Sequence, residues 1–448
     1  MKIALAHFRV GETDGVSLEM DKWKIALEKL GHSVFYIAGS KGTSENEVHI
    51  IPELHYMNEQ NNRIAENAYK ALKDYDAIGL ENEIESISDA ISFKINEVVR
   101  KNNIDMIVPN NIWSLGWGLP AGLGFYKSAK SLNIKWGAHH HDFSWEREKY
   151  SNPTIPYVKD LIVNVFPPGL PGIKHVVINS LAKNELEKRR GIKATIVPNV
   201  FDFEAPMWKR DDYNSDFRQR LGLKDSDIVI LQGTRIVERK AIELAIDVAG
   251  GIVSRKTFLI GKKLWNGMEF NAQSRIVLFF AGLDESTPPY LDLLKAKAKD
   301  LNVELLFGNQ FIEHSRTQKN CEKIYSLWDA YVYADLITYP SVLEGWGNQF
   351  LEGLFAKVPM VVYEYPVFES DIKSVGFEIV SLGSRHKIDA NKLVHVEKSI
   401  IDKAGEECVR LLIDGVYRSA AVEKNFKLGL KNYSYSALSA ILEKLFRG

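Results

Sequence analysis

Apolar and polar positions follow two different periods over the first forty residues. Residues 3–6 form a short apolar run that predicts a strand, and a polar loop over 9–14 follows. Apolar side chains then recur at steps of four and three, which predicts a helix with one buried face: Val16, Met20, Trp23, Leu27 and Leu30. Gly31 is placed to end that helix, and residues 34–37 supply the next strand. This order predicts a βαβ unit of a parallel sheet.

The same rhythm continues to residue 197. Further strands are predicted at 106–108, 135–139, 176–179 and 194–197. Ser180 is the expected N-cap of a helix over 181–190, and Gly191 lies just past its end. The segment 198–200 and the charged stretch 204–216 then interrupt the periodicity. We therefore expect the first domain to end near residue 200.

The strand and helix pattern restarts at residue 227. It predicts strands at 228–231, 276–280, 303–307, 336–339 and 361–363, and a helix over 241–249. A last helix carries an apolar stripe of Leu438, Ile441, Leu442 and Leu445. The sequence thus predicts an α/β protein with two Rossmann-like, doubly wound domains, 1–200 and 201–430, and a final helix within 431–448. Two such sheets facing each other would enclose a central cleft at their C-terminal strand ends.

Composition narrows the class of protein. The chain has 448 residues, more than one core usually organises, and 57 Lys and Arg against 58 Asp and Glu leave no positive field for nucleic acid. Cys321 and Cys408 are too few for a disulfide framework, which favours a cytoplasmic protein. Arg9 cuts off the first apolar run, so a signal peptide is not expected. No uncharged apolar stretch approaches the ~18 residues of a membrane span, and peripheral membrane contact stays open.

The segment 341–352, SVLEGWGNQFLE, is the most informative part of the chain. Gly345 and Gly347 let the backbone approach a ligand closely, and a helix is expected to start near Asn348. Loop amides and a helix N-terminus then point at one place, which suits an anion. Glu344 and Glu352 beside it suit a ligand that also carries hydroxyl groups. The alternative is that both glutamates are solvated surface residues.

A second candidate segment, 231–240, lies between a predicted strand and a helix. Gly233 permits a tight exit from the strand, and Arg235 and Lys240 lie on the loop and at the helix start. Cations there oppose the helix dipole unless an anion lies between them, so this pair could neutralise a pyrophosphate. The alternative is that Arg235 and Lys240 are ordinary surface residues without a ligand. We expect Glu238 and Arg239 to form a solvated face.

In the N-terminal half, three histidines and Asp142 follow a predicted strand. Side chains alternate along a strand, so His139, His140 and His141 are not expected to bind one metal ion. One imidazole with Asp142 is better suited to contact a sugar. Residues 143–147 are expected to line the opening of the same sugar-binding cleft. The aromatic, glycine-rich loop 113–122 is expected to pack against the core and not to bind a ligand. The dinucleotide-binding and P-loop fingerprints are absent, and the acidic pair in 74–76 is expected to be solvated.

These motifs resemble the family-four (group 1) retaining glycosyltransferases, which have the GT-B fold. The resemblance rests on Gly233 to Arg235 with Lys240, on residues 325–341, and on the spacing of Glu344 and Glu352. Weaker matches are Gly15, residues 31–32, residues 141–142 and residues 197–199. Two departures are Val200, where the family has glycine, and an apparent insertion over 256–274.

The resemblance implies a role for each matched residue. Arg235 and Lys240, after Gly233, would hold the donor pyrophosphate, and Glu352 the ribose hydroxyls. Glu344 and the amides that follow would hold the transferred sugar; these are Gly345, Trp346, Gly347, Asn348 and Gln349. From the acceptor-side N-terminal domain, His141 would contact that sugar, and Gly15 would lie near the phosphates and the acceptor. The last helix would cross back to the first domain.

The expected function is transfer of a hexose from a nucleotide diphosphate sugar to an acceptor hydroxyl, with retention at the anomeric carbon. No metal or other cofactor is expected, and the acceptor is a sugar, a lipid-linked sugar or a small molecule. Oligomeric state stays open. The alternatives are a phosphorylase or nucleotide-sugar epimerase on the same fold, and a nucleotide-sugar-binding protein without turnover.

Overall fold

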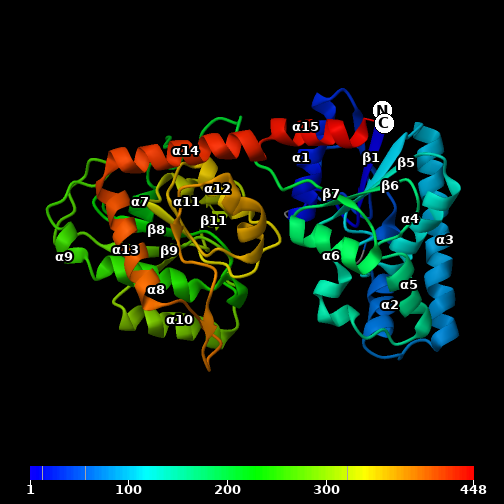
Figure 1. Ribbon diagram of the computed structural model, residues 1–448, viewed down its shortest axis with the longest axis horizontal. Coiled ribbons are helices and arrows are strands. Elements are labelled where there is room, and N and C mark those ends of the chain that lie inside the picture. Colours follow the sequence, from blue (N-terminus) through cyan, green and yellow to red (C-terminus); the bar gives the residue numbers. More distant parts are fainter. Residues whose placement is uncertain (13, 56, 320, 448) are drawn as a thin grey trace. The chain divides into compact units, whose positions relative to one another are not determined.

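The computed structural model describes residues 1–12, 14–55, 57–319 and 321–447, and the chain divides into two compact units. Unit 1 comprises Met1–Val200 and Tyr435–Gly448, and unit 2 comprises Phe201–Ser434. Figure 1 shows each unit as strands covered by helices. Among the described helices, none is both long and apolar enough to cross a membrane.

Unit 1 contains a parallel sheet in the order β3-β2-β1-β4-β5-β6-β7. Its strands are β1 Lys2–His7, β2 Ser33–Ala38, β3 Val48–Ile50, β4 Met106–Pro109, β5 Lys135–His140, β6 Ile173–Val177 and β7 Ala194–Ile196. Its helices are α1 Gly15–Lys29, α2 Glu59–Tyr69, α3 Ala77–Asn102, α4 Leu119–Ser131, α5 Pro156–Asn164, α6 Ser180–Arg190 and α15 Tyr435–Phe446. Short 3-10 turns are η1 Pro52–Leu54, η2 Ser144–Glu146 and η3 Glu148–Tyr150.

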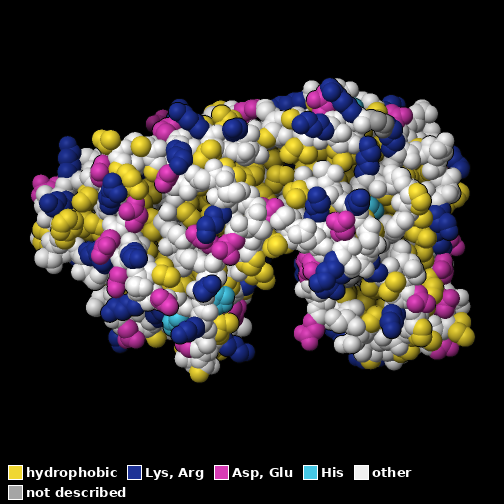
Figure 2. Space-filling view, in the orientation of Figure 1, with side chains coloured by type: hydrophobic (Ala, Val, Ile, Leu, Met, Phe, Trp, Pro, Cys, Tyr) yellow, Lys and Arg dark blue, Asp and Glu magenta, His cyan; other side chains and the backbone are white. Residues whose placement is uncertain are grey.

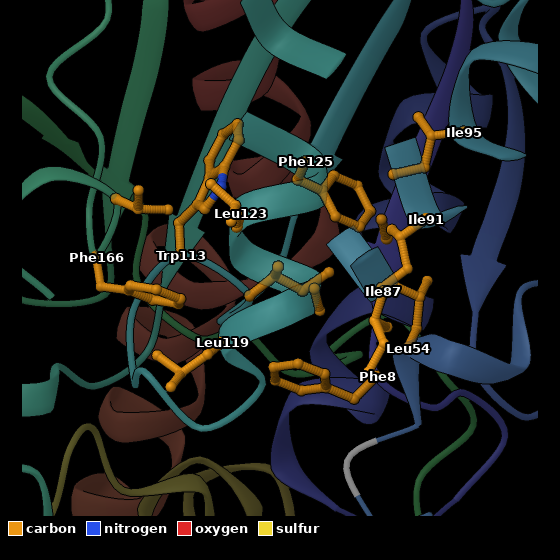
Figure 3. Packing of buried hydrophobic residues seen from close by; sticks show 14 of the residues in the cluster. Phe8, Leu54, Ile87, Ile91, Ile95, Trp113, Leu119, Leu123, Phe125 and Phe166 are labelled. Atoms are coloured by element: carbon orange, nitrogen blue, oxygen red, sulfur yellow. The ribbon is translucent and has the colours of Figure 1, made fainter. Parts of the chain in front are cut away.

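Both faces of this sheet are buried. Ala4 and Ala6 belong to a core cluster with α3, α4 and α5, whereas Ile3 and Leu5 belong to a cluster with α1 and α15, because successive side chains of a strand point to opposite faces. Figure 3 shows the first cluster, in which Phe125 of α4 lies next to Ile91 of α3, and Trp113, before α4, lies farther from Ile91, near Leu123. In the second cluster, Leu438, Leu442 and Phe446 of α15 pack with Trp23 of α1.

Unit 2 is built around a second parallel sheet, in the order β10-β9-β8-β14-β15-β16. Its strands are β8 Ile228–Gln232, β9 Ile276–Phe280, β10 Glu304–Phe307, β14 Leu336–Tyr339, β15 Met360–Val362 and β16 Val380–Ser381. Smaller sheets contain β11 Ile312–Glu313, β12 Thr317–Lys319 and β13 Glu322–Ser326, and β17 Lys387–Ile388 and β18 Val394–His395.

The helices of unit 2 are α7 Phe217–Arg220, α8 Ile242–Val253, α9 Lys256–Leu259, α10 Pro288–Asp300, α11 Leu327–Val332, α12 Asn348–Phe355, α13 Lys398–Ile413 and α14 Gly415–Tyr433. The 3-10 turns η4 Glu238–Lys240 and η6 Lys373–Val375 and the π-helical turn η5 Phe368–Ile372 complete it. The predicted fold class, two doubly wound α/β domains, is confirmed. In each sheet the strand order reverses once, between β1 and β4 and between β8 and β14, and such points place ligand-binding loops.

Two predicted details of the β6–α6 region are wrong. β6 covers Ile173–Val177 and ends before residue 179. The N-cap of α6 is Asn179 and not Ser180, because the Asn179 side chain accepts from the Ala182 amide at 2.7 Å. The segment 256–274 packs into unit 2: Leu259, Leu264 and Phe270 are buried, and the Trp265 indole donates to Asp335 at 2.7 Å.

Candidate active site

The loop between β14 and α12 is held by two tyrosines that β14 and the segment after β15 provide. Gly347 has a φ of +119°, and a Cβ there would overlap the hydroxyl of Tyr365. That hydroxyl donates to the carbonyl of Trp346 at 2.6 Å, and Trp346 is itself buried. Only glycine fits this turn, so the chain enters α12 at Asn348 with a fixed direction, as the sequence predicted.

Lys240 and Glu344 come from neighbouring strands and form a buried ion pair. β8 and β14 lie side by side, and their following loops bring Lys240 Nζ against Glu344 Oε1. Their side chains are 9% and 12% exposed. Arg239 Nη1 lies 3.5 Å from Glu344 Oε2, so Glu344 is neither a solvated surface residue nor paired with one cation alone. The Arg239 side chain is 41% exposed, so it lies at the solvent-facing edge of this pair, as expected for a solvated residue.

Charge and burial act together on Lys240. Burial lowers the pKa of Lys240, Glu344 opposes that shift, and the like charges of Arg239 and Arg235 add to the lowering. Lys240 also lies 5.8 Å above the ring of Tyr339. Lys240 and Arg239 both contact Glu344, and the charge of Arg235 also acts on Lys240, so the site concentrates positive charge in a way that suits an anionic ligand.

Arg235 forms an ion pair with a different carboxylate, that of Glu285. Its Nη1 donates to both oxygens of Glu285 at 2.8 and 3.0 Å, and Glu285 lies on the loop after β9. The Arg235 side chain is 51% exposed, so this pair is weak and can exchange for a ligand phosphate. Glu285 was not among the predicted residues.

Gly233 and Gln349 meet where β8 ends. A Cβ on Gly233 would lie 2.6 Å from Gln349 Nε2, so glycine is needed for this close approach. Gln349 is buried, and its Oε1 has no hydrogen-bond partner within the described part of the chain. A buried amide oxygen without a partner at a helix N-terminus is a sign of a ligand-binding position.

Glu352 lies one turn further along α12. Its Oε2 accepts a hydrogen bond from the hydroxyl of Tyr331 at 2.7 Å, and Tyr331 belongs to α11. Burial and then the charge of Glu352 raise the pKa of Tyr331, so the hydroxyl stays protonated and orients the carboxylate. Glu352 is half-buried, which again differs from a solvated helix residue.

Unit 1 carries its polar residues at the C-terminal ends of β1, β4 and β5. Asn111, after β4, accepts from the amide of His141 at 2.8 Å and donates to Asp142 at 2.8 Å. His141 Nε2 is buried and has no hydrogen-bond partner among the described residues. Burial and then the neighbouring His7 lower the pKa of His141 to about 3, so its imidazole is neutral at pH 7.

Gly15 is the first residue of α1, and a carboxylate occupies the helix end beside it. Asp14 Oδ1 accepts from the amides of Val16 and Ser17, each at 3.1 Å. This side chain satisfies the N-terminal amides that the expected position of Gly15 near phosphates would use. Asp14 is missed by the sequence reading, although an acidic residue just before an apolar helix pattern is an N-cap signal.

The other polar and aromatic residues of unit 1 are mostly structural. His139 and His140 are buried at the end of β5, and His140 Nε2 lies 3.0 Å from His175 Nδ1. Within the described residues, no group of three or more His, Cys, Asp or Glu is placed to hold a metal ion. Phe143 is fully buried and stacks on Trp145, so the expectation that it lines an open mouth is wrong.

Two known proteins are similar to this chain over nearly its whole length. The chain is 41% identical over 420 residues to a mannosylglucosylglycerate synthase of Petrotoga mobilis, which covers 93% of this chain and 95% of that protein. It is 40% identical over 448 residues to a mannosylglucosylglycerate synthase of Thermotoga maritima, which covers 99% of each. A scan against family profiles gives no match.

Solved structures agree in fold. A glycosyltransferase from Rickettsia africae matches with a TM-score of 0.61 at 13% identity, over 100% of this chain and 99% of that one. WaaG, a glycosyltransferase involved in lipopolysaccharide biosynthesis, matches with a TM-score of 0.56 at 13% identity, over 100% of both chains. The relatives show the activity class and the structures show the fold: the chain is an enzyme and belongs to the family-four (group 1) glycosyltransferases of the GT-B fold.

Proposed function

We propose that this enzyme transfers a mannosyl group from a nucleotide diphosphate mannose to glucosylglycerate, with retention and without a metal ion. The two relatives at 40% and 41% identity are mannosylglucosylglycerate synthases, and that name describes a mannosylated glucosylglycerate as the product. The observation that carries the proposal is the pairing of Lys240 and Arg239 with Glu344 in the loop before α12, together with Arg235, whose charge also acts on Lys240. It suits a diphosphate that leaves with increasing negative charge.

The proposed reaction needs only groups that this chain provides. The bond between the anomeric carbon and the diphosphate oxygen breaks, and its electron pair leaves with the diphosphate. The acceptor hydroxyl oxygen forms the new bond on the same face, and its proton passes to a phosphate oxygen of the leaving group. Lys240, Arg239 and Arg235 supply the positive charge that stabilises the leaving diphosphate, a task that a divalent metal performs in other sites.

The remaining residues position the donor. The carboxylate of Glu352, oriented by Tyr331, accepts hydrogen bonds from the ribose hydroxyls. The carboxylate of Glu344 accepts hydrogen bonds from the hydroxyls of the transferred sugar, and the loop amides donate hydrogen bonds to them. Gln349 uses its buried Oε1 to accept from a ligand group. His141 contacts the transferred sugar through its neutral imidazole, as an acceptor at Nε2.

The proposal is tested with purified enzyme, a panel of nucleotide diphosphate sugars and glucosylglycerate. We expect nucleoside diphosphate and mannosylglucosylglycerate to form in equal amounts, at rates that EDTA does not change. With an α-linked donor, we expect NMR to show that the product is the α-anomer. Loss of activity in EDTA that Mg²⁺ or Mn²⁺ restores would contradict metal independence, and an inverted product would contradict retention. Transfer to other acceptors but not to glucosylglycerate would refute the acceptor assignment.

A further inference from the structure

Lys149 is an exposed cation in unit 1, after the C-terminal end of β5. It lies on η3, in the loop that follows β5 and His141. Its Nζ lies 4.2 Å from the ring centre of Trp117 and 4.8 Å from that of Tyr150. Within the described residues, no carboxylate lies within ion-pairing distance of this ammonium, and the side chain is exposed, so an external anion can reach it.

The two aromatic rings are fixed by the rest of unit 1. Tyr150 is buried, and its ring packs edge-on against Tyr69 at 5.1 Å. The Tyr69 hydroxyl donates to the carbonyl of Gly116 at 2.5 Å, which anchors the loop next to Trp117. Lys149 therefore lies on a preorganised surface, and a ligand would not have to order this loop on binding.

Two charged neighbours, Arg147 and Asp142, act on Lys149. Arg147, two residues earlier, donates to Asp142 from Nε at 2.9 Å and also from Nη2. Asp142 in turn accepts from Asn111, the residue that also holds the His141 amide. Burial and then the charge of Arg147 lower the pKa of Lys149, and the charge of Asp142, which is paired with Arg147, opposes that shift.

The proposed acceptor carries a group that matches this place. Glycerate is a carboxylic acid that is ionised near pH 7, so glucosylglycerate is a monoanion that needs a cation on the acceptor side. We propose that Lys149, on the surface formed by Trp117 and Tyr150, binds the carboxylate of the acceptor and selects acidic over neutral acceptors. This inference rests on the proposed function, and it adds a specificity residue that the donor-site motifs do not include.

The test compares two acceptors that differ only in this group, glucosylglycerate and glucosylglycerol. Initial rates are measured at saturating donor for the unmodified enzyme and for Lys149→Gln, Lys149→Arg and Lys130→Gln. Lys130 is the matched control, because it lies 5.5 Å over the ring of Tyr126 in the last turn of α4. We expect Lys149→Gln to raise the KM for glucosylglycerate about tenfold, equivalent to ~1.4 kcal/mol, with kcat and the kinetics on glucosylglycerol unchanged. Lys149→Arg is expected to restore most of the affinity, and Lys130→Gln to change neither acceptor.

Several results would overturn the inference. One is an unchanged KM for glucosylglycerate in Lys149→Gln. Another is an equal loss of activity on glucosylglycerate and glucosylglycerol in that variant, because this result indicates a damaged loop. Calorimetric binding of glucosylglycerate to the enzyme alone separates this inference from the proposed function. Binding that Lys149→Gln weakens, without any transfer, refutes the transfer reaction and supports the subsite. Transfer that proceeds with the same preference in Lys149→Gln refutes the subsite and leaves the reaction in place.

Discussion

Lys240→Met is the substitution that best separates folding from catalysis at this site. It removes a cation with a 9% exposed side chain and leaves Glu344, 12% exposed, with Arg239 at 3.5 Å as its nearest cation. Breaking a fully buried ion pair costs ~3–5 kcal/mol of stability. Because Arg239 still compensates Glu344 in part, we expect the free energy of unfolding to fall by about 2–3 kcal/mol.

The catalytic loss is expected to be larger and independent of folding. Removing one group that stabilises developing charge typically lowers kcat by about 10²–10³, or ~2.7–4 kcal/mol. The double variant Lys240→Met/Glu344→Gln no longer contains an unpaired carboxylate, so its stability is expected to return to within about 1 kcal/mol of the starting enzyme. Its kcat is expected to stay low, because the cation is still missing. Urea unfolding and steady-state kinetics measure the two quantities.

A second ion pair in unit 2 provides the control. Lys297 Nζ lies 2.8 Å from Asp247 Oδ1, between α10 and α8, and both side chains are less than 20% exposed. Lys297→Met is expected to lower stability by a similar amount without changing kcat. The reasoning is refuted if Lys240→Met keeps full turnover while folded, or if the double variant recovers kcat together with stability.

Three further predictions concern other parts of the molecule. Arg235→Ala is expected to lower kcat about 100-fold while the free energy of unfolding changes by less than about 1 kcal/mol, because its ion pair is exposed; equal losses in the two measurements would contradict this. Gly347→Ala is expected to destabilise unit 2 by more than about 2 kcal/mol in urea unfolding, because its Cβ overlaps the Tyr365 hydroxyl, whereas Gly376→Ala, at a φ of +86° with open space around it, should cost about 1 kcal/mol. Burial lowers the pKa of the buried histidines on β1, β5 and β6, to about 4 for His175. Below pH 6.5 the unfolded chain therefore binds more protons than the folded chain, so the free energy of unfolding is expected to fall from pH 6.5 towards pH 4. His175→Gln should reduce that slope, and an unchanged slope in urea titrations at several pH values would exclude its contribution.

The hydrophobic periods were sufficient to predict the elements that carry the donor site. Residues 228–231, 336–339 and the start of α12 at Asn348 agree with the structure to within one residue. These segments are short apolar runs bounded by glycine and polar residues, so local patterns determine them. The fold class followed from the repeated strand and helix order.

The contacts between residues of the site could not be predicted from local sequence patterns. Lys240 and Glu344 are 104 residues apart, and Arg235 and Glu285 are 50 apart, so each pairing depends on which strands are neighbours in the sheet. Local patterns also do not distinguish fully buried aromatic residues from partly buried ones. Trp113 is 1% exposed in the core, whereas Trp117, four residues later, lies beside Lys149.

The position of α15 has a consequence for biosynthesis. Leu438, Leu442 and Phe446 complete a core whose other members, such as Trp23, are translated first. Unit 1 can therefore bury that face only after residues 201–434 have been translated, which takes on the order of 10–50 s at typical elongation rates. During this interval the apolar face of α1 is exposed on the nascent chain, so we expect it to be a binding site for chaperones on the ribosome, and ribosome profiling of chaperone-bound nascent chains would detect it.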